Sequence, residues 1–171
     1  MYKRQIKERV ATLTLCDCFF SYKKALSPEN QKEFIELRQR PLLAGKPLSE
    51  LAPTLIESLV GPNCSDRARK KLYQSILDIH VSSYLKTIEA STKFNAIGSL
   101  ANISAPVQLI FGEYDKLTPP SVGKFMHSQL PNSTLKIISN SGHLSNIEQP
   151  EDFNLIMSKF IETHRAQAVF K

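Results

Sequence analysis

The chain has few cysteines and no long hydrophobic run. No apolar segment approaches the ~20 residues that a membrane-spanning helix needs, so no membrane partner is expected. No hydrophobic stretch follows the charged start Met1-Tyr2-Lys3-Arg4, so no secretory signal is expected either. Cys16, Cys18 and Cys64 are an odd number of thiols and a poor disulfide framework. These absences predict a cytoplasmic protein with reduced thiols.

The sequence also lacks internal repeats, low-complexity tracts and an even distribution of charge. The net charge is +6, and residues 1–100 hold 16 Lys and Arg against 10 Asp and Glu, whereas residues 101–171 hold 6 of each. The densest basic cluster is Arg67, Arg69, Lys70 and Lys71, with no interleaved aromatic residue. This pattern favours a solvated helix face, and a nucleic-acid partner is not expected; a basic nucleic-acid-binding module is the weaker alternative.

Short apolar and β-branched runs predict three strands, at residues 11–16, 107–111 and 135–138. Helix start signals occur at Ser27-Pro28, Ser49, Ser65-Asp66, Pro119-Pro120 and Pro150. Residues 19–100 read as helices without a strand, and residues 84–94 continue this helical character. From Pro106 onward strand and helix alternate, which predicts a parallel sheet within a single domain-sized chain.

Two short motifs follow the second and third predicted strands. The first is Gly112-Glu113-Tyr114-Asp115, and the second is Ser141-Gly142-His143-Leu144. The carboxyl ends of parallel strands meet at one edge of an open sheet, where binding and catalytic groups gather. We therefore expect Asp115 and His143 to lie close together.

From about Ile103 to His164 the chain resembles the C-terminal part of an α/β hydrolase. The matching residues are Ile103-Ser104-Ala105-Pro106, the strand after them, Gly112-Glu113-Tyr114-Asp115, Thr118-Pro119, Ser141-Gly142-His143, Glu148-Gln149-Pro150-Glu151 and Phe153-Asn154. The order of acid and then histidine is also the order in that family, where a serine precedes both. The similarity is greatest to the branch of lactonases, esterases and carbon–carbon-bond hydrolases, in which a helical cap lies between the sixth and seventh strands. The stretch Glu8–Leu15 resembles the entry into the sixth strand.

The resemblance implies an α/β class: a partial α/β-hydrolase fold of about three parallel strands with flanking helices and a helical cap insertion. Residues 1–18 would hold the first strand of this partial core, residues 19–100 the cap and a linking helix, and residues 101–171 the C-terminal core. Asp115 would orient His143, and His143 would be the general base. The resemblance implies no metal and no cofactor.

The sequence contains no Gly-x-Ser-x-Gly motif, so the nucleophile of such a triad is not supplied. The expected function is that of the C-terminal part of a serine-type hydrolase for an ester, a lactone or a related carbonyl compound, inactive as this chain alone. Its substrate, once the missing half is present, would be small, apolar and ester-like. The alternative is a non-catalytic truncated hydrolase-like fragment or interaction module, and an exposed sheet would make it self-associate.

Other residues compete for these roles less well. Asp17 follows the first strand and is the alternative acid, while Thr118 is expected to cap a helix rather than to take part in chemistry. Cys16 and Cys18 lack the further ligands of a zinc site and read as small buried side chains. No substitute nucleophile is expected among Ser65, Cys64, Ser139 and Ser141, and no role is assigned to His80, His127 and His164.

Overall fold

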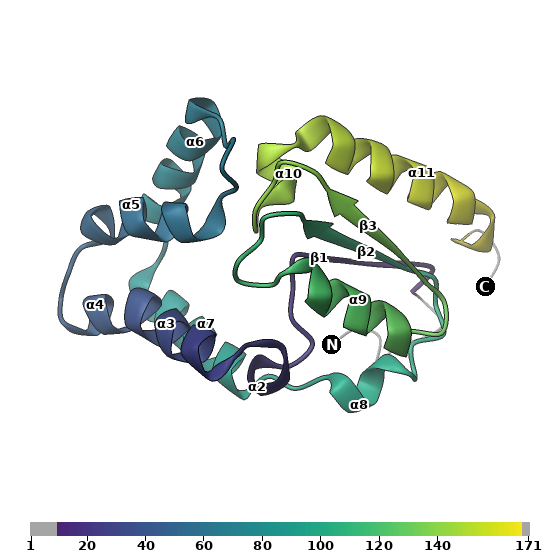
Figure 1. The fold of residues 1–171 in the computed structure, drawn as a ribbon, viewed down its shortest axis with the longest axis horizontal. Helices are drawn as coiled ribbons and strands as arrows, with labels where there is room; N and C mark the ends of the chain where they lie inside the picture. Colours follow the sequence, from purple (N-terminus) through teal and green to yellow (C-terminus); the bar gives the residue numbers. More distant parts are fainter. Residues whose placement is uncertain (1–9, 169–171) are drawn as a thin grey trace.

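The computed structural model describes residues 10–168 and contains one sheet of three parallel strands (Figure 1). The strands are β1 (Leu13–Cys16), β2 (Val107–Gly112) and β3 (Ser133–Ile138), hydrogen-bonded in the order β1-β2-β3. The start of β2 at Val107 lies opposite both Leu13 and Ser133. The expected α/β class and parallel sheet are confirmed, and the three carboxyl ends share one rim. The charged start and the residues Glu8 and Arg9 lie outside the described residues.

The central strand β2 is buried along its whole length, which fits its continuous apolar sequence. Helix α9 (Pro120–Gln129) covers one side of the sheet and α11 (Pro150–Ala168) covers the other (Figure 1). Two short helices, α8 (Ile97–Leu100) and α10 (Ser145–Glu148), complete this part. The core on the α9 side is formed by Phe20, Leu100, Val107, Leu109, Phe111, Val122, Met126 and Leu130. This packing fixes the strand ends that bear the candidate site.

The stretch between β1 and β2 is helical, as its sequence predicts. Besides α8, its helices are α2 (Tyr22–Ala25), α3 (Pro28–Arg38), α4 (Arg40–Leu43), α5 (Leu48–Leu59), α6 (Asp66–Leu77) and α7 (Val81–Lys93). Ser27 and Ser65 are N-caps, because their side chains accept hydrogen bonds from the amides of Asn30 and Ala68. The expected cap at Ser49 is wrong: the N-cap position of α5 is Pro47, two residues earlier, and the helix begins at Leu48.

The helical stretch leaves and rejoins the core at one place, because Ser21 and Asn95 form an isolated antiparallel bridge. It also contacts the core at a second place. Leu144, directly before α10, and Ile147, within it, pack against the apolar cluster of α5 and α6. The helices therefore lie directly against the loop that carries His143.

Within residues 10–168, no helix is both long and apolar enough to cross a lipid bilayer.

Candidate active site

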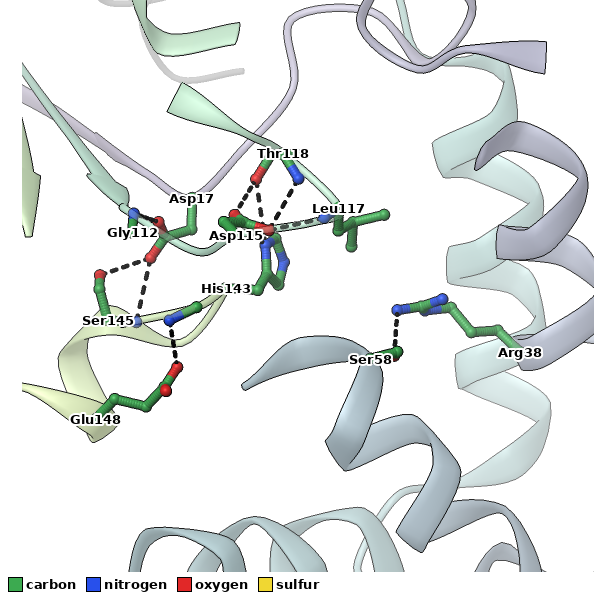
Figure 2. A network of polar contacts seen from close by, with 11 residues as sticks. Asp17, Arg38, Ser58, Gly112, Asp115, Leu117, Thr118, His143, Ser145 and Glu148 are labelled. Atoms are coloured by element: carbon green, nitrogen blue, oxygen red, sulfur yellow. Dashed lines mark hydrogen bonds and ion pairs between the residues drawn. The ribbon is translucent and has the colours of Figure 1, made fainter. Parts of the chain in front are cut away.

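Two loops at the carboxyl ends of β2 and β3 bring Asp115 and His143 together (Figure 2). The Asp115 carboxylate oxygen Oδ2 lies 2.9 Å from Nδ1 of His143, although the residues are 28 positions apart. The side chain of Asp115 is fully buried, whereas that of His143 is 20% exposed. The expected proximity is thus present as a direct hydrogen bond between a buried acid and an accessible imidazole.

Hydrogen-bond donors surround the buried carboxylate of Asp115. Its Oδ1 accepts bonds from the main-chain amides of Leu117 at 2.8 Å and Thr118 at 2.9 Å. Its Oδ2 accepts a bond from the Thr118 hydroxyl at 2.6 Å as well as from His143. A buried charge is tolerated only where such partners replace water, so this loop is built to hold an ionised acid.

The hydrogen bond assigns the tautomer of His143. An ionised carboxylate only accepts, so Nδ1 of His143 carries the proton that is shared with Asp115. The neutral ring then has its lone pair on Nε2. Among residues 10–168, the hydrogen bonds of His143 involve Nδ1 and the main chain only. Nε2 is therefore free to take a proton from an incoming hydroxyl.

Close contact with the end of α5 fixes the main chain at His143. The His143 amide donates to the carbonyl of Leu59 at 2.6 Å, and Gly142 packs so tightly there that a Cβ atom on it would lie 2.4 Å from the same oxygen. Glu148 spans this contact, because its two carboxylate oxygens accept bonds from the amides of Gly61 at 2.7 Å and Gly142 at 2.8 Å. Only glycine fits at position 142 in this arrangement.

Thr118 does not cap a helix, contrary to expectation. It is not the cap of α9, whose N-cap position is Pro119. Its hydroxyl is instead completely buried and donates to Asp115. A buried acid leaves a lone pair that needs a donor, and this demand outweighs the local preference of threonine for a helix end.

The structure separates the two candidate acids. Asp17 does not bond to His143; its carboxylate accepts bonds from Gly112 and Ser145 instead. The sequence pattern indicates no role for Ser145, and Glu148 stands out only within the motif Glu148-Gln149-Pro150-Glu151. No local signal could have revealed Ser145, because its partner is 128 residues away.

Arg38 is a buried cation on the helical side of the site (Figure 2). Its guanidinium lies over the ring of Phe34, 4.9 Å from the centroid, and donates to the hydroxyl of Ser58 at 3.4 Å. Burial lowers the pKa of Arg38. Ser58 is in the last turn of α5, whose carbonyl groups carry partial negative charge, so the cation stabilises that helix end.

The remaining candidates have structural surroundings. Burial raises the pKa of Cys16 to about 11 and of Cys18 to about 12, so neither thiol is a reactive thiolate. Ser141 donates to the carbonyl of Ile138, and Ser65 caps α6. In the described part of the chain, no group of three or more His, Cys, Asp or Glu is arranged to hold a metal ion.

Two cavities on the described part of the surface are not lined by this pair. One, of about 320 Å³, is bordered by Phe20 and Phe125, and the other, of about 530 Å³, lies between α5 and α6. Neither is lined by Asp115 or His143, so neither is the substrate site of this pair.

Comparison with known proteins decides the family. A family model described as the alpha/beta hydrolase fold matches residues 19–150. The chain belongs to the α/β hydrolase family. A 3-oxoadipate enol-lactonase of Acinetobacter baylyi is 35% identical over 99 residues, 58% of this hydrolase chain and 37% of the relative. A 2-hydroxy-6-oxononadienedioate/2-hydroxy-6-oxononatrienedioate hydrolase of Pseudomonas putida is 30% identical over 101 residues, 54% of this chain and 35% of the relative.

Solved structures show the same fold. A thermophilic esterase from Thermogutta terrifontis, solved with malate bound, superposes with a TM-score of 0.78 at 23% identity. The match covers 95% of this hydrolase chain and 60% of the esterase. In the enol-lactonase and in the oxononadienedioate hydrolase, the aligned regions span 37% and 35% of the relative's length.

Proposed function

We propose that the chain supplies the acid, the base and the cap of a serine-type hydrolase that acts on an ester, a lactone or a related carbonyl compound. The observation that carries this proposal is the hydrogen bond between the buried Asp115 and the accessible His143. The partial sequence match of the chain to an enol-lactonase and to an oxononadienedioate hydrolase supports the proposed substrate class.

The chemistry follows from the free lone pair on Nε2 of His143. This nitrogen takes the proton of a seryl hydroxyl as the oxygen attacks the carbonyl carbon, and then gives it to the leaving group. Asp115 keeps the ring in the required tautomer and stabilises the imidazolium that forms. The serine and the donors for the oxyanion come from outside residues 10–168, on a partner chain or on a further segment. The helices between β1 and β2 cover the apolar substrate.

An esterase assay tests this proposal. A short p-nitrophenyl ester is offered to the chain alone, and to the chain combined with a hydrolase segment that contains Gly-x-Ser-x-Gly. We expect turnover only from the combination, and a loss of about 10³-fold or more when His143 is changed to Gln. Replacing His127, whose ring bonds to Ser133 near the end of α9, is the matched control. A well-folded combination without turnover contradicts the proposal.

A second function is favoured by the free edge of β1. Within residues 10–168, β1 pairs on one side only, with β2. An unpaired strand edge is a template for another strand, which predicts self-association of the chain by itself. Sedimentation of the isolated chain tests this: we expect oligomers, and a monodisperse monomer with a cooperative thermal transition contradicts it.

A further inference from the structure

Asp17 directly follows β1, and its side chain bonds to Gly112 at the end of β2 and to Ser145 at the start of α10 (Figure 2). Its backbone has a φ of 41°, a left-handed conformation that is uncommon for a residue other than glycine. Its amide still continues the sheet, because it donates to the carbonyl of Ile110 at 2.9 Å. The turn directs the carboxylate across the rim: Oδ1 accepts a bond from the amide of Gly112 at 2.8 Å, and Oδ2 accepts bonds from the hydroxyl of Ser145 at 2.6 Å and its amide at 3.3 Å.

These two partners are the bases of the two loops that form the site. Gly112 is the last residue of β2, three residues before Asp115. Ser145 is the first residue of α10, two residues after His143, and it is completely buried. One carboxylate therefore fastens both loops, from a residue that lies 95 positions from one anchor and 128 from the other.

We propose that Asp17 is a positioning residue for the pair formed by Asp115 and His143, which its carboxylate holds at hydrogen-bond distance by tethering both loops. This role deepens the proposed function and rests on it. Catalytic pairs need their geometry held to within about 0.5 Å, and short tethers to buried anchors provide that precision. Among the described residues, the hydrogen bonds of the Asp17 side chain go to Gly112 and Ser145, and not to Asp115 or His143.

The charges around Asp17 make the tether depend on pH. The groups that face it are Cys16 and Cys18 on its own strand end, Asp115 after β2 and His143 after β3. Burial, with a smaller effect of the negative charge on Asp115, raises the pKa of Asp17 to about 6, against the lowering effects of the bonds from Ser145 and Gly112 and of His143. Above this pH the carboxylate accepts all three bonds. Below it, the protonated acid accepts fewer of these bonds, although loss of the buried charge itself favours the folded state.

The test reads the tautomer of His143 in the full chain by ¹⁵N NMR of the imidazole at pH 8. We expect the Nδ1-protonated form in the native chain and a mixture of both tautomers in Asp17→Asn. The matched control is Glu113→Gln, because Glu113 also joins the two loops, by accepting a bond from the amide of Asn140 at 3.0 Å, but does so at the exposed surface. The control is expected to retain the native tautomer.

Ser145→Ala provides a second variant that removes a single hydroxyl and keeps the Asp17 carboxylate, in case Asp17→Asn does not fold. It is expected to shift the tautomer in the same direction. In the native chain, the amide signal of Gly112 should titrate with a midpoint near pH 6, and this step should be absent in Asp17→Asn. Native tautomer populations in folded Asp17→Asn, or in Ser145→Ala if the first variant does not fold, overturn the proposal.

The two proposals fail separately. The imidazole signals need no substrate and no nucleophile, so an inactive combination in the esterase assay leaves the result for Asp17 unaffected. If the combination is active, Asp17→Asn should lower kcat by about 10- to 100-fold with little change in KM, because misplacement acts on the chemical step. An unchanged kcat also overturns the role of Asp17.

Discussion

At the scale of single residues, the site depends on how a buried carboxylate is satisfied. Asp115 and Asp17 both lie at the rim of the sheet, yet their surroundings differ. Asp115 accepts from two amides, a hydroxyl and an imidazole, whereas Asp17 binds two structural anchors. The partners, rather than the residue type, separate the candidate acid from the positioning residue.

Replacing Thr118 by Val should remove one donor to Asp115 and leave the shape of the side chain unchanged. An oxygen of the fully buried carboxylate then loses a partner, so we expect the free energy of unfolding to fall by about 1–3 kcal/mol. Urea denaturation measures this. Thr163→Val is the control, because the hydroxyl of Thr163 donates to the main-chain carbonyl of Lys159 on the exposed face of α11. The loss of this bond should cost about 0.5 kcal/mol or less. Equal effects of the two changes contradict the assigned role of Thr118.

The raised pKa of Asp17 predicts a pH dependence of stability. Its ordinary value of 3.8 rises to about 6 in the folded chain. Between these values the folded chain holds a proton that the unfolded chain releases, so this contribution is fully present below pH 3.8 and is lost as the pH rises through 6. The stability of the native chain relative to Asp17→Asn should therefore fall by roughly 2 kcal/mol between pH 4 and pH 7.

Denaturation of both proteins over this pH range checks the prediction. Asp152→Asn, at an exposed position in the first turn of α11, serves as the comparison for removing an acid at the surface. A relative stability of Asp17→Asn that does not change with pH is the contrary result.

At the scale of elements, the end of α5 and the loop before α10 form one contact. Gly142→Ala would place a Cβ 2.4 Å from the carbonyl oxygen of Leu59 and 2.6 Å from the amide nitrogen of Gly61, and both atoms belong to the backbone. The loop must move, so we expect a loss of about 2 kcal/mol or more in the free energy of unfolding. Gly98→Ala is the matched control: it lies in α8 with nothing within 4 Å, and should change stability by less than about 1 kcal/mol. Thermal unfolding of both variants decides between these outcomes.

The elements also show what sequence alone can predict. The three strands and the helix starts at Ser27, Ser65 and Pro150 have strong local signals, and the structure confirms them. The short helices α2, α4, α8 and α10 were not predicted, since four residues carry too little periodicity. The cap at Ser49 failed because tertiary packing of α5 fixes its start at Leu48, which is buried.

Sequence alone also predicts only some of the contacts in the candidate site. The contact between Asp115 and His143 was predictable, because parallel strand ends share a rim and the two motifs follow adjacent strands. The bonds of Asp17 to Gly112 and Ser145 were not, because register and loop conformation determine them over separations of 95 and 128 residues. Sequence patterns locate chemical groups at a sheet edge, but they do not assign the partners among them.

At the scale of the whole molecule, the chain has the α/β hydrolase fold around an acid–histidine pair and contains no Gly-x-Ser-x-Gly. The helices between β1 and β2 lie against the loop of His143 through Leu59, Gly61 and Glu148. This contact joins the helical stretch to the loop that carries His143.

The measurement that tests the account most directly is the rate at which a fluorophosphonate labels the serine of Gly-x-Ser-x-Gly in the combined protein. The label reports activation of the hydroxyl without requiring a matched substrate. With native His143 we expect rapid labelling, and with His143→Gln a rate lower by about 10³-fold or more, because Nε2 no longer removes the proton. Equal labelling rates in the two proteins would show that His143 and Asp115 do not serve a serine.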